Sequence, residues 1–435
     1  MTSTASTVPI ERVSPPNEGA VEARPPAGRW AAWTLTWVSY ATYYLGRKGI
    51  SVAKAPIAES LGKDALLGVD TAYLAAYAAG QYVNGFLGDR IGARKLITAG
   101  MLVSGAACCA FGASSAGIAF LLAFAVNGFA QSTGWPGNIK AMSEWTTAQN
   151  RGRVMGLWAT CYQVGGIVAT WFATLMLGFW GWRASFWGPA VVVALVGILV
   201  FLFLKPGPGA NLAKPVSGGE TPNSIEIEQK RKIERSRVLK SPTIWCYGAS
   251  YFGMKLIRYS LLFWLPFYLT TALAYSKTTA GYMSISFEVG GVLGTIGMGA
   301  LSDRNRGISR SVLAAVWLVL LAGAIFLYAQ IGATNLVVNF AVMALVGALL
   351  FGPDSLISGA AAQDAGGPYA AATAAGLVNG IGSIGAILQE YVTRGVSQKY
   401  GWDKLFYVFV VLAVFSAFCL VPTFKARATA ETVKA

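Results

Sequence analysis

Two arginines interrupt long apolar segments of this chain. Arg47 lies within the stretch Tyr43–Gly49, which reads YYLGRKG, and Arg258 lies in another apolar segment past the middle of the sequence. An arginine at the centre of a membrane helix costs about 2.5–3.5 kcal/mol even on the lenient insertion scale, so it tends to face a cavity and a partner. Because the guanidinium group offers its donors as a fork that fits phosphate or carboxylate, the pair predicts a site for an anion, best a phosphate.

The composition predicts a membrane protein. Of the 435 residues, 55% are hydrophobic and 12% are charged, whereas soluble domains carry about 25% charged residues. The apolar residues form blocks that are long enough to cross a bilayer of roughly 30 Å as helices. We therefore expect an all-α membrane protein with twelve transmembrane helices. The blocks cover residues 30–52, 67–88, 96–114, 117–143, 153–179, 184–204, 243–272, 279–301, 311–330, 334–362, 370–394 and 403–423.

The distribution of charge predicts the orientation of the helices. Lysines and arginines gather in the loops on one side, most densely in residues 205–240, while the opposite loops hold few cations. Because cationic loops stay in the cytoplasm, we expect a multi-pass protein of the cell (inner) membrane with both termini cytoplasmic. The formal net charge of +15 then reflects this orientation and contact with anionic lipid, and we expect no nucleic-acid partner.

The chain divides into two related halves. The loop after the second block reads GFLGDRIGARK from Gly85, and the loop after the eighth reads GALSDRNRG from Gly299. Asp303 follows Asp89 by 214 residues, close to the 211 residues that separate Arg258 from Arg47. Two repeats of six helices resemble the major facilitator arrangement, in which the substrate binds near the midplane between the halves.

This repeat predicts the domain organisation. We expect six-helix bundles over residues 29–204 and 241–424, joined by a charged, proline-containing cytoplasmic linker over 205–240. The polar ends, 1–28 and 425–435, are expected to be cytoplasmic tails, the first of them disordered.

The repeated loop predicts a gate. An aspartate at a helix end beside arginines can form a charge cluster that holds the halves together in one state and releases in the other. A plain topology signal is the alternative. Glu288, in the eighth block, could instead pair with Arg258 inside its own half. The residues expected in this charge network are Asp89, Arg90, Arg94, Lys140, Glu288, Asp303 and Arg304.

Several stretches resemble one family in order along the chain. YYLGRKG is similar to the first-helix motif of the organophosphate:phosphate antiporters, which include glycerol-3-phosphate and hexose-phosphate transporters. The resemblance implies exchange of a phosphorylated metabolite for inorganic phosphate by a rocker-switch motion, with the phosphate bound by Arg47 and Arg258. The other similar stretches are Gly134-Trp135-Pro136 with Lys140 beyond it, Arg258-Tyr259 with Trp264, Phe287–Gly291, Phe351-Gly352-Pro353 and Tyr400-Gly401-Trp402.

Five positions depart from that family. Ala159, Tyr162 and Gln163 stand where the fifth-helix signature has Asn, His and Asn, while Gln81 and Phe263 replace a Lys and an Asp of the glycerol-phosphate members. These departures weaken the case for glycerol 3-phosphate and favour a sugar or polyol phosphate in a relined pocket. The residues expected to bind substrate are Arg47, Arg258, Lys48, Tyr43, Tyr44, Tyr77, Gln81, Tyr162 and Lys255.

The residue types also limit the chemistry. The chain has no histidine, which removes the usual proton relay near neutral pH, and it has no cysteine cluster for a metal. We expect no metal, no cofactor and no enzymatic activity, and a protein that is a monomer. The expected partners are a phosphorylated small molecule, inorganic phosphate and the lipid bilayer.

Some alternatives remain open. Paired arginines also suit a carboxylate or nitrate, and a sugar-phosphate sensor could share the same fold. Asp354 and Glu390 lie inside predicted helices and could either carry protons or pair with cations, so antiport and proton-coupled transport are both possible.

Overall fold

The computed structural model describes residues 28–62, 66, 68–147, 149–208, 224–305 and 307–424. The two expected tails lie outside these residues except for Gly28, and so does the part of the expected linker from 209 to 223. The described residues are helical, with no β-strand among them.

The first half contains six membrane passes, three of which are broken into two helices. One break follows α5, where the hydroxyl groups of Ser132 and Thr133 donate to the carbonyl oxygens of Phe129 and Ala130 at 2.6 and 2.7 Å. Such local bonds compete with the helical ladder. The helices are α1 (Arg29–Tyr43), α2 (Leu45–Leu61), α3 (Val69–Ile91), α4 (Ala93–Ala113), α5 (Gly117–Gln131), α6 (Gly134–Trp145), α7 (Arg151–Trp158), α8 (Cys161–Trp180) and α9 (Ala184–Phe203).

The second half follows the linker helix α10 (Ser224–Lys240). Three of its helices have side-chain N-caps. Ser276 accepts a hydrogen bond from the N–H of Thr279, Ser309 accepts one from the N–H of Val312, and Asn335 accepts one from the N–H of Val338. The elements are α11 (Pro242–Thr271), α12 (Lys277–Arg304), α13 (Arg310–Ile331), α14 (Leu336–Ser355), the π-helical turn η3 (Leu356–Ala361), α15 (Ala362–Tyr400), α16 (Trp402–Leu420) and the 3₁₀ turn η4 (Val421–Thr423).

Twelve passes emerge from these elements. Eight helical segments of the described residues are long and apolar enough to cross a membrane. One of them, Leu336–Tyr400, holds two passes, because the backbone leaves the helical conformation at Gly367 and Ala370. The remaining three passes are made by α1 with α2, by α3 and by α11, which are shorter or more polar. Arg47 lies on α2, and Arg258 lies on α11. The expected all-α fold with twelve transmembrane helices is therefore confirmed.

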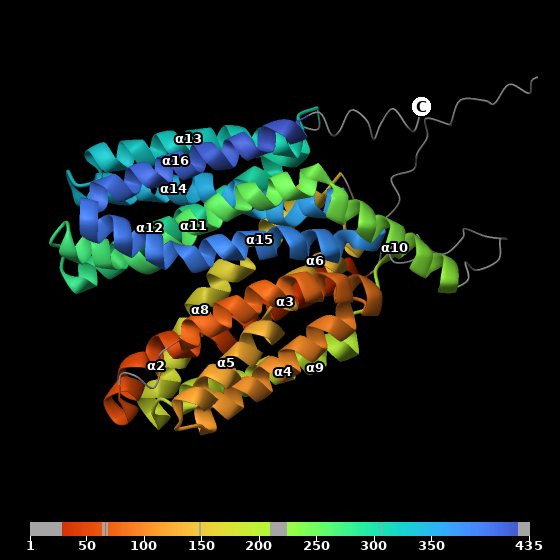
Figure 1. Ribbon diagram of the computed structural model, residues 1–435, viewed down its shortest axis with the longest axis horizontal. Helices are drawn as coiled ribbons and strands as arrows, with labels where there is room; N and C mark the ends of the chain where they lie inside the picture. Colours follow the sequence, from red (N-terminus) through yellow and green to blue (C-terminus); the bar gives the residue numbers. More distant parts are fainter. Residues whose placement is uncertain are drawn as a thin grey trace, which may run out of the picture.

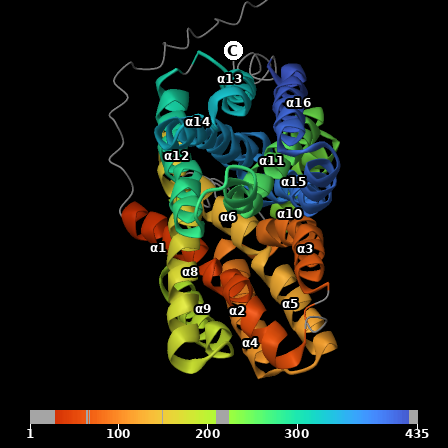
Figure 2. The same cartoon turned by 90° about the vertical axis from the view of Figure 1, so that its left-hand side faces the viewer.

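The two halves lie against each other at one end of the molecule and diverge at the other. In Figure 1 the first half lies below the second, with α10 beside the end where they meet, and Figure 2 shows the same stacking from the other end. Asp89 and Asp303 lie at the end where the halves meet, which we call the motif end. There α3 packs against α15, and α7 against α12.

Glycines allow the close approach of these helix pairs. A Cβ atom on Gly85 would lie 3.0 Å from the carbonyl oxygen of Ala372 and 3.3 Å from the Cα of Gly376. A Cβ on Gly156 would lie 3.0 Å from the Cα of Gly299. Gly85 and Gly299 are the first residues of the two repeated loops, so the same position makes the backbone contact in both interfaces.

Candidate functional site

A cavity of about 550 Å³ lies between the two halves. Arg47 from α2 and Arg258 from α11 both line it. Lys54 and Asp70 also line it, and they form an ion pair beside the loop between α2 and α3. Because α3 runs from Asp70 to the motif end, the cavity reaches the end of the molecule opposite to the motif end. Its volume is within the usual range for small-molecule sites.

Arg47 is held by aromatic and amide groups of its own half. Its Nε donates to Oε1 of Gln131 at 3.1 Å, and its guanidinium carbon lies 4.4 Å from the ring centre of Tyr44 and 5.6 Å from that of Tyr77. Gln131 is positioned in turn by Ser104, to which its Nε2 donates. The Nη2 atom of Arg47 is buried without a hydrogen-bond partner, so this arginine keeps a donor for an anion.

Arg258 has an acidic partner. Its Nη1 donates to Oδ2 of Asp354 at 2.9 Å, and the hydroxyl group of Tyr162 donates to the same oxygen at 3.3 Å. The guanidinium carbon lies 4.6 Å from the ring centre of Tyr162 and 4.5 Å from that of Phe351. Only one nitrogen of the fork bonds Asp354, and Nε of Arg258 has no partner.

This partner corrects one of the alternatives drawn from the sequence. Glu288 was considered as the partner of Arg258, but it lines the wall of the cavity together with Lys48. Asp354 from α14 forms the ion pair with Arg258 instead. The sequence marked Asp354 as an acid inside an apolar block without indicating its partner, because that partner depends on how α14 packs against α11.

A third cation lies one helical turn before Arg258. Nζ of Lys255 donates to Oδ1 of Asn379 at 2.6 Å and to Oγ of Ser383 at 3.1 Å, both on α15. A small polar recess of about 20 Å³ adjoins the main cavity and is lined by both arginines, Lys255 and Asp354.

We call Arg47, Arg258, Lys255 and Asp354 the floor of the cavity. Three cations and one carboxylate give the floor a formal charge of +2. Buried charge of one sign is costly without a partner, and a bound anion would supply that partner.

The other expected substrate-binding residues divide into two groups. Lys48, Tyr44, Tyr77 and Tyr162 line the cavity. Tyr43 and Gln81 are absent from its lining, and their side chains are bonded inside the first half instead.

Tyr43 is buried, and its hydroxyl group donates to the carbonyl oxygen of Ile97 at 3.1 Å. The same hydroxyl group lies 2.7 Å from the hydroxyl group of Thr133. The sequence predicts one helix over residues 30–52, which contains Tyr43 and Arg47, but the structure breaks this helix between α1 and α2 at Tyr44. Tyr43 therefore lies outside the lining of the cavity in this structure.

Gln81 also lies outside the lining of the cavity in this structure. Gln81 is buried, and its Nε2 donates to the carbonyl oxygen of Ser132 at 3.2 Å. That carbonyl is available because the residue four positions later is Pro136, which has no N–H group to donate.

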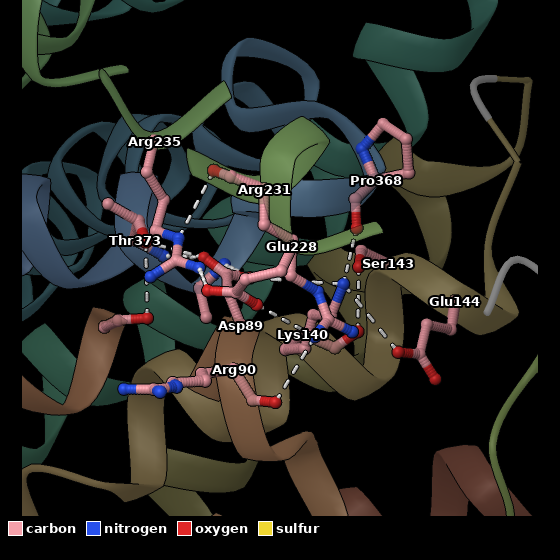
Figure 3. Close-up of polar contacts among 12 residues, drawn as sticks. Asp89, Arg90, Lys140, Ser143, Glu144, Glu228, Arg231, Arg235, Pro368 and Thr373 are labelled. Carbon is pink, nitrogen blue, oxygen red and sulfur yellow. Dashed lines mark hydrogen bonds and ion pairs between the residues drawn. The ribbon is translucent and has the colours of Figure 1, made fainter. Parts of the chain in front are cut away.

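The motif end is closed by aspartates that cap helices of the opposite half. Asp89 accepts hydrogen bonds from the N–H groups of Ala372 and Thr373 at 3.1 and 2.8 Å and from the Thr373 hydroxyl group at 2.6 Å (Figure 3). These residues follow the break in α15. A carboxylate at a helix N-terminus is stabilised by the free N–H groups and the helix dipole.

Asp303 makes the equivalent contact in the other half. It accepts hydrogen bonds from the N–H groups of Gly152 and Arg153 at 2.9 and 2.7 Å, at the start of α7. The two repeated aspartates thus join the halves through matching helix caps, an arrangement that the sequence, read as clusters of ion pairs, did not show.

The cations at this end differ from those expected. Arg90, Arg94 and Arg304 are exposed, and among the described residues the cations within 4.0 Å of the two aspartates are Lys140 and Arg310. An arginine that directly follows an aspartate in a helix points about 100° away from it, which explains why the adjacent arginines are not its partners.

Lys140 and Asp364 link the halves further. Lys140 lies 4.0 Å from Asp89 and donates to the carbonyl oxygen of Pro368 (Figure 3). Asp364 on α15 pairs with Arg151 of α7 and with Arg310 at 2.8 Å. The sequence did not mark Asp364 or Arg310 for this role, because both lie in ordinary polar loops.

Comparisons with known proteins agree with this geometry. The family model of the Major Facilitator Superfamily matches residues 36–389. An Arabidopsis thaliana protein provisionally named glycerol-3-phosphate transporter 2 is 32% identical, over 89% of this chain and 84% of its own. The glucose-6-phosphate exchanger SLC37A2 of Homo sapiens is 30% identical over 89% and 90%, and sugar phosphate exchanger 3 of Xenopus laevis is 29% identical over 90% and 91%.

A solved structure supports the fold. The human organic anion transporter MFSD10 aligns with a TM-score of 0.68 at 14% sequence identity, covering 91% of this chain and 100% of that one. The resemblance inferred from the motifs is thus confirmed by relatives along most of the chain. The protein belongs to the major facilitator superfamily, in the family that contains these glycerol-3-phosphate transporters and sugar phosphate exchangers.

Proposed function

We propose that the protein is a secondary active transporter that exchanges a phosphorylated metabolite for inorganic phosphate by alternating access. The floor of the cavity carries this proposal, because each half contributes to it an arginine, a side chain that stays charged at all physiological pH values. Phosphate monoesters are mostly dianionic above a second pKa of about 6. The relatives, named for glycerol 3-phosphate, glucose 6-phosphate and sugar phosphates, support the same substrate class.

The phosphate group supplies the force for alternation. A dianion that contacts Arg47 and Arg258 draws the two halves together around the cavity, while the caps made by Asp89 and Asp303 must release for the motif end to open. A ligand shifts such an equilibrium only through its different affinity for the two states. Without a bound anion, the positive charges of the two halves repel each other and oppose closure of the cavity. The empty transporter therefore changes state slowly, and transport takes place as exchange.

The proposal includes an orientation in the membrane. The motif end and both termini face the cytoplasm of the cell, and the cavity opens to the other side of the inner membrane. The bundles over 29–204 and 241–424 move as the two halves of a monomer, with 205–240 joining them. The positive loops at the motif end support this orientation.

Phosphate counterflow in proteoliposomes tests the function. Vesicles loaded with inorganic phosphate should take up labelled phosphate, and external glycerol 3-phosphate, pentose phosphates and hexose phosphates should compete. Uptake that is blocked by nitrate or a dicarboxylate and not by phosphate esters would assign a different anion. Saturable ester binding without any exchange would assign a sensor.

The Asp354 carboxylate should weaken phosphate binding and speed its release. Asp354→Asn raises the formal charge of the floor from +2 to +3 and leaves Arg258 a neutral amide oxygen as its acceptor in place of the carboxylate. We expect phosphate to bind about fivefold more tightly and exchange to slow about tenfold, because one charge at an effective dielectric constant of about 20 contributes at least 1 kcal/mol. Equilibrium binding and initial exchange rates measure the two effects. Weaker binding would instead show that Asp354 positions Arg258 for the ligand.

A further inference from the structure

Two side chains on α15, those of Gln389 and Glu390, carry hydrogen-bond acceptors that have no partner among the described residues. Gln389 lines the main cavity and is 5% exposed, and its Oε1 is buried without a hydrogen-bond partner. Glu390 lines the same cavity and is exposed to it, and within the described chain no cation lies within 4.0 Å of its carboxylate. Neither residue belongs to the floor, so the phosphate group does not explain them.

The register of α15 places these acceptors above the floor. Lys255 donates to Asn379 and Ser383, which are four residues apart. Glu390 follows Ser383 by seven residues, so the three residues lie on one face of the helix. Gln389 and Glu390 follow Ser383 by six and seven residues, which places them about 9 and 10.5 Å farther along the helix axis. This is longer than a phosphate ion, and the body of an extended phosphate ester can span it.

The chemistry of the acceptors defines what they bind. A carboxylate and an amide oxygen accept hydrogen bonds and cannot donate them through those atoms, so a ligand there must bring donors. The other charged groups in the wall are Lys48 with Glu288, and Lys54 paired with Asp70. Hydroxyl groups on the body of the ester fit the remaining acceptors, and they leave the dianion to the floor.

We propose that Gln389 and Glu390 form a hydroxyl-binding subsite that selects phosphate esters of five- and six-carbon polyols or sugars over glycerol 3-phosphate and inorganic phosphate. This inference rests on the proposed function, since it assumes that the phosphate group binds the floor. A three-carbon ester anchored there is too short to reach the subsite, whereas a longer chain or ring presents its far hydroxyl groups to both side chains.

The experiment compares ligands within one set of variants. Gln389→Leu and Glu390→Gln are reconstituted in phosphate-loaded liposomes, and competition by inorganic phosphate, glycerol 3-phosphate, glucose 6-phosphate and 2-deoxyglucose 6-phosphate is measured against phosphate self-exchange. We expect inhibition by glucose 6-phosphate to weaken about tenfold in Glu390→Gln, which loses a charged acceptor, and about fivefold in Gln389→Leu, which loses a neutral one, because hydrogen bonds to charged groups are the stronger ones. Inhibition by phosphate and glycerol 3-phosphate should stay within about twofold of the wild type.

The outcomes separate the two ideas. Gln398→Leu, on an exposed part of the same helix, is the matched control and should leave all four ligands unchanged. Equal losses for every ligand, or no loss for glucose 6-phosphate, would overturn the subsite while leaving phosphate exchange established. If wild-type vesicles show no phosphate exchange at all, the proposed function fails first. A deoxy ester that loses less than glucose 6-phosphate in the variants would identify a hydroxyl group that the subsite binds.

Discussion

Replacing Arg258 by lysine should lower exchange of phosphate esters at least a hundredfold, and Arg47→Lys should do the same. Lysine keeps the charge but loses the planar fork and its stacking on aromatic rings. At Arg258 the fork bonds Asp354 through one nitrogen and stacks on Tyr162 and Phe351, so its remaining donors are already oriented for a ligand. Loss of one or two charged hydrogen bonds costs about 3 kcal/mol, which corresponds to about a hundredfold.

Initial rates of phosphate self-exchange at matched amounts of reconstituted protein measure this effect. Arg237→Lys is the control, since Arg237 lies on α10 outside the cavity and its side chain is 68% exposed. The control should retain wild-type exchange, and all three variants should insert normally and elute as folded protein. Near-normal exchange in both Arg47→Lys and Arg258→Lys would show that the floor does not bind the phosphate group.

Valine in place of Gly376 should prevent the motif end from closing. A Cβ at this position would clash with the carbonyl oxygen of Gln81 and would lie 2.9 Å from the Cα of Gly85. Both obstacles are backbone atoms of α3, so the helices must separate, and overpacking of this kind costs about 1–3 kcal/mol or more. The closed state should therefore lose about tenfold or more of its population, and exchange should fall in proportion.

Distances between spin labels measure that shift directly. Labels at Ile91 and Ile308, exposed residues at the motif end of each half, should report a larger population of long distances in Gly376→Val. Gly395→Val is the matched control on the same helix, because a Cβ there meets nothing within 4 Å. If Gly376→Val exchanged phosphate normally with an unchanged distance distribution, the backbone contact would not be part of the gate.

The membrane passes could be predicted from the sequence because the bilayer imposes them. The predicted block 184–204 and helix α9 (Ala184–Phe203) differ by one residue at one end, since a long apolar run has few other stable forms in lipid. The break between α1 and α2 at Tyr44 was not predictable in this way. It lies inside a continuous apolar block and depends on how the neighbouring helices pack.

In the candidate site, the sequence predicted the buried charges but not their partners. The arginines stood out because charge is costly in an apolar block, and both line one cavity. The partner of Arg258 could not be predicted from residue types. Asp354 and Glu288 are both acids inside apolar blocks, and only the packing of α14 and α12 shows which of them reaches the arginine. Gln389 was missed for a different reason, because a glutamine near a helix end carries no signal until its oxygen is found buried without a partner.

The claim on which the account depends is that one phosphate group contacts Arg47 and Arg258 together. Structure determination of the protein in lipid nanodiscs with saturating inorganic phosphate tests it most directly. The account predicts a single phosphate density in the floor, within hydrogen-bonding distance of both guanidinium groups. A phosphate bound to one arginine alone, or an empty floor at concentrations that support exchange, would contradict it.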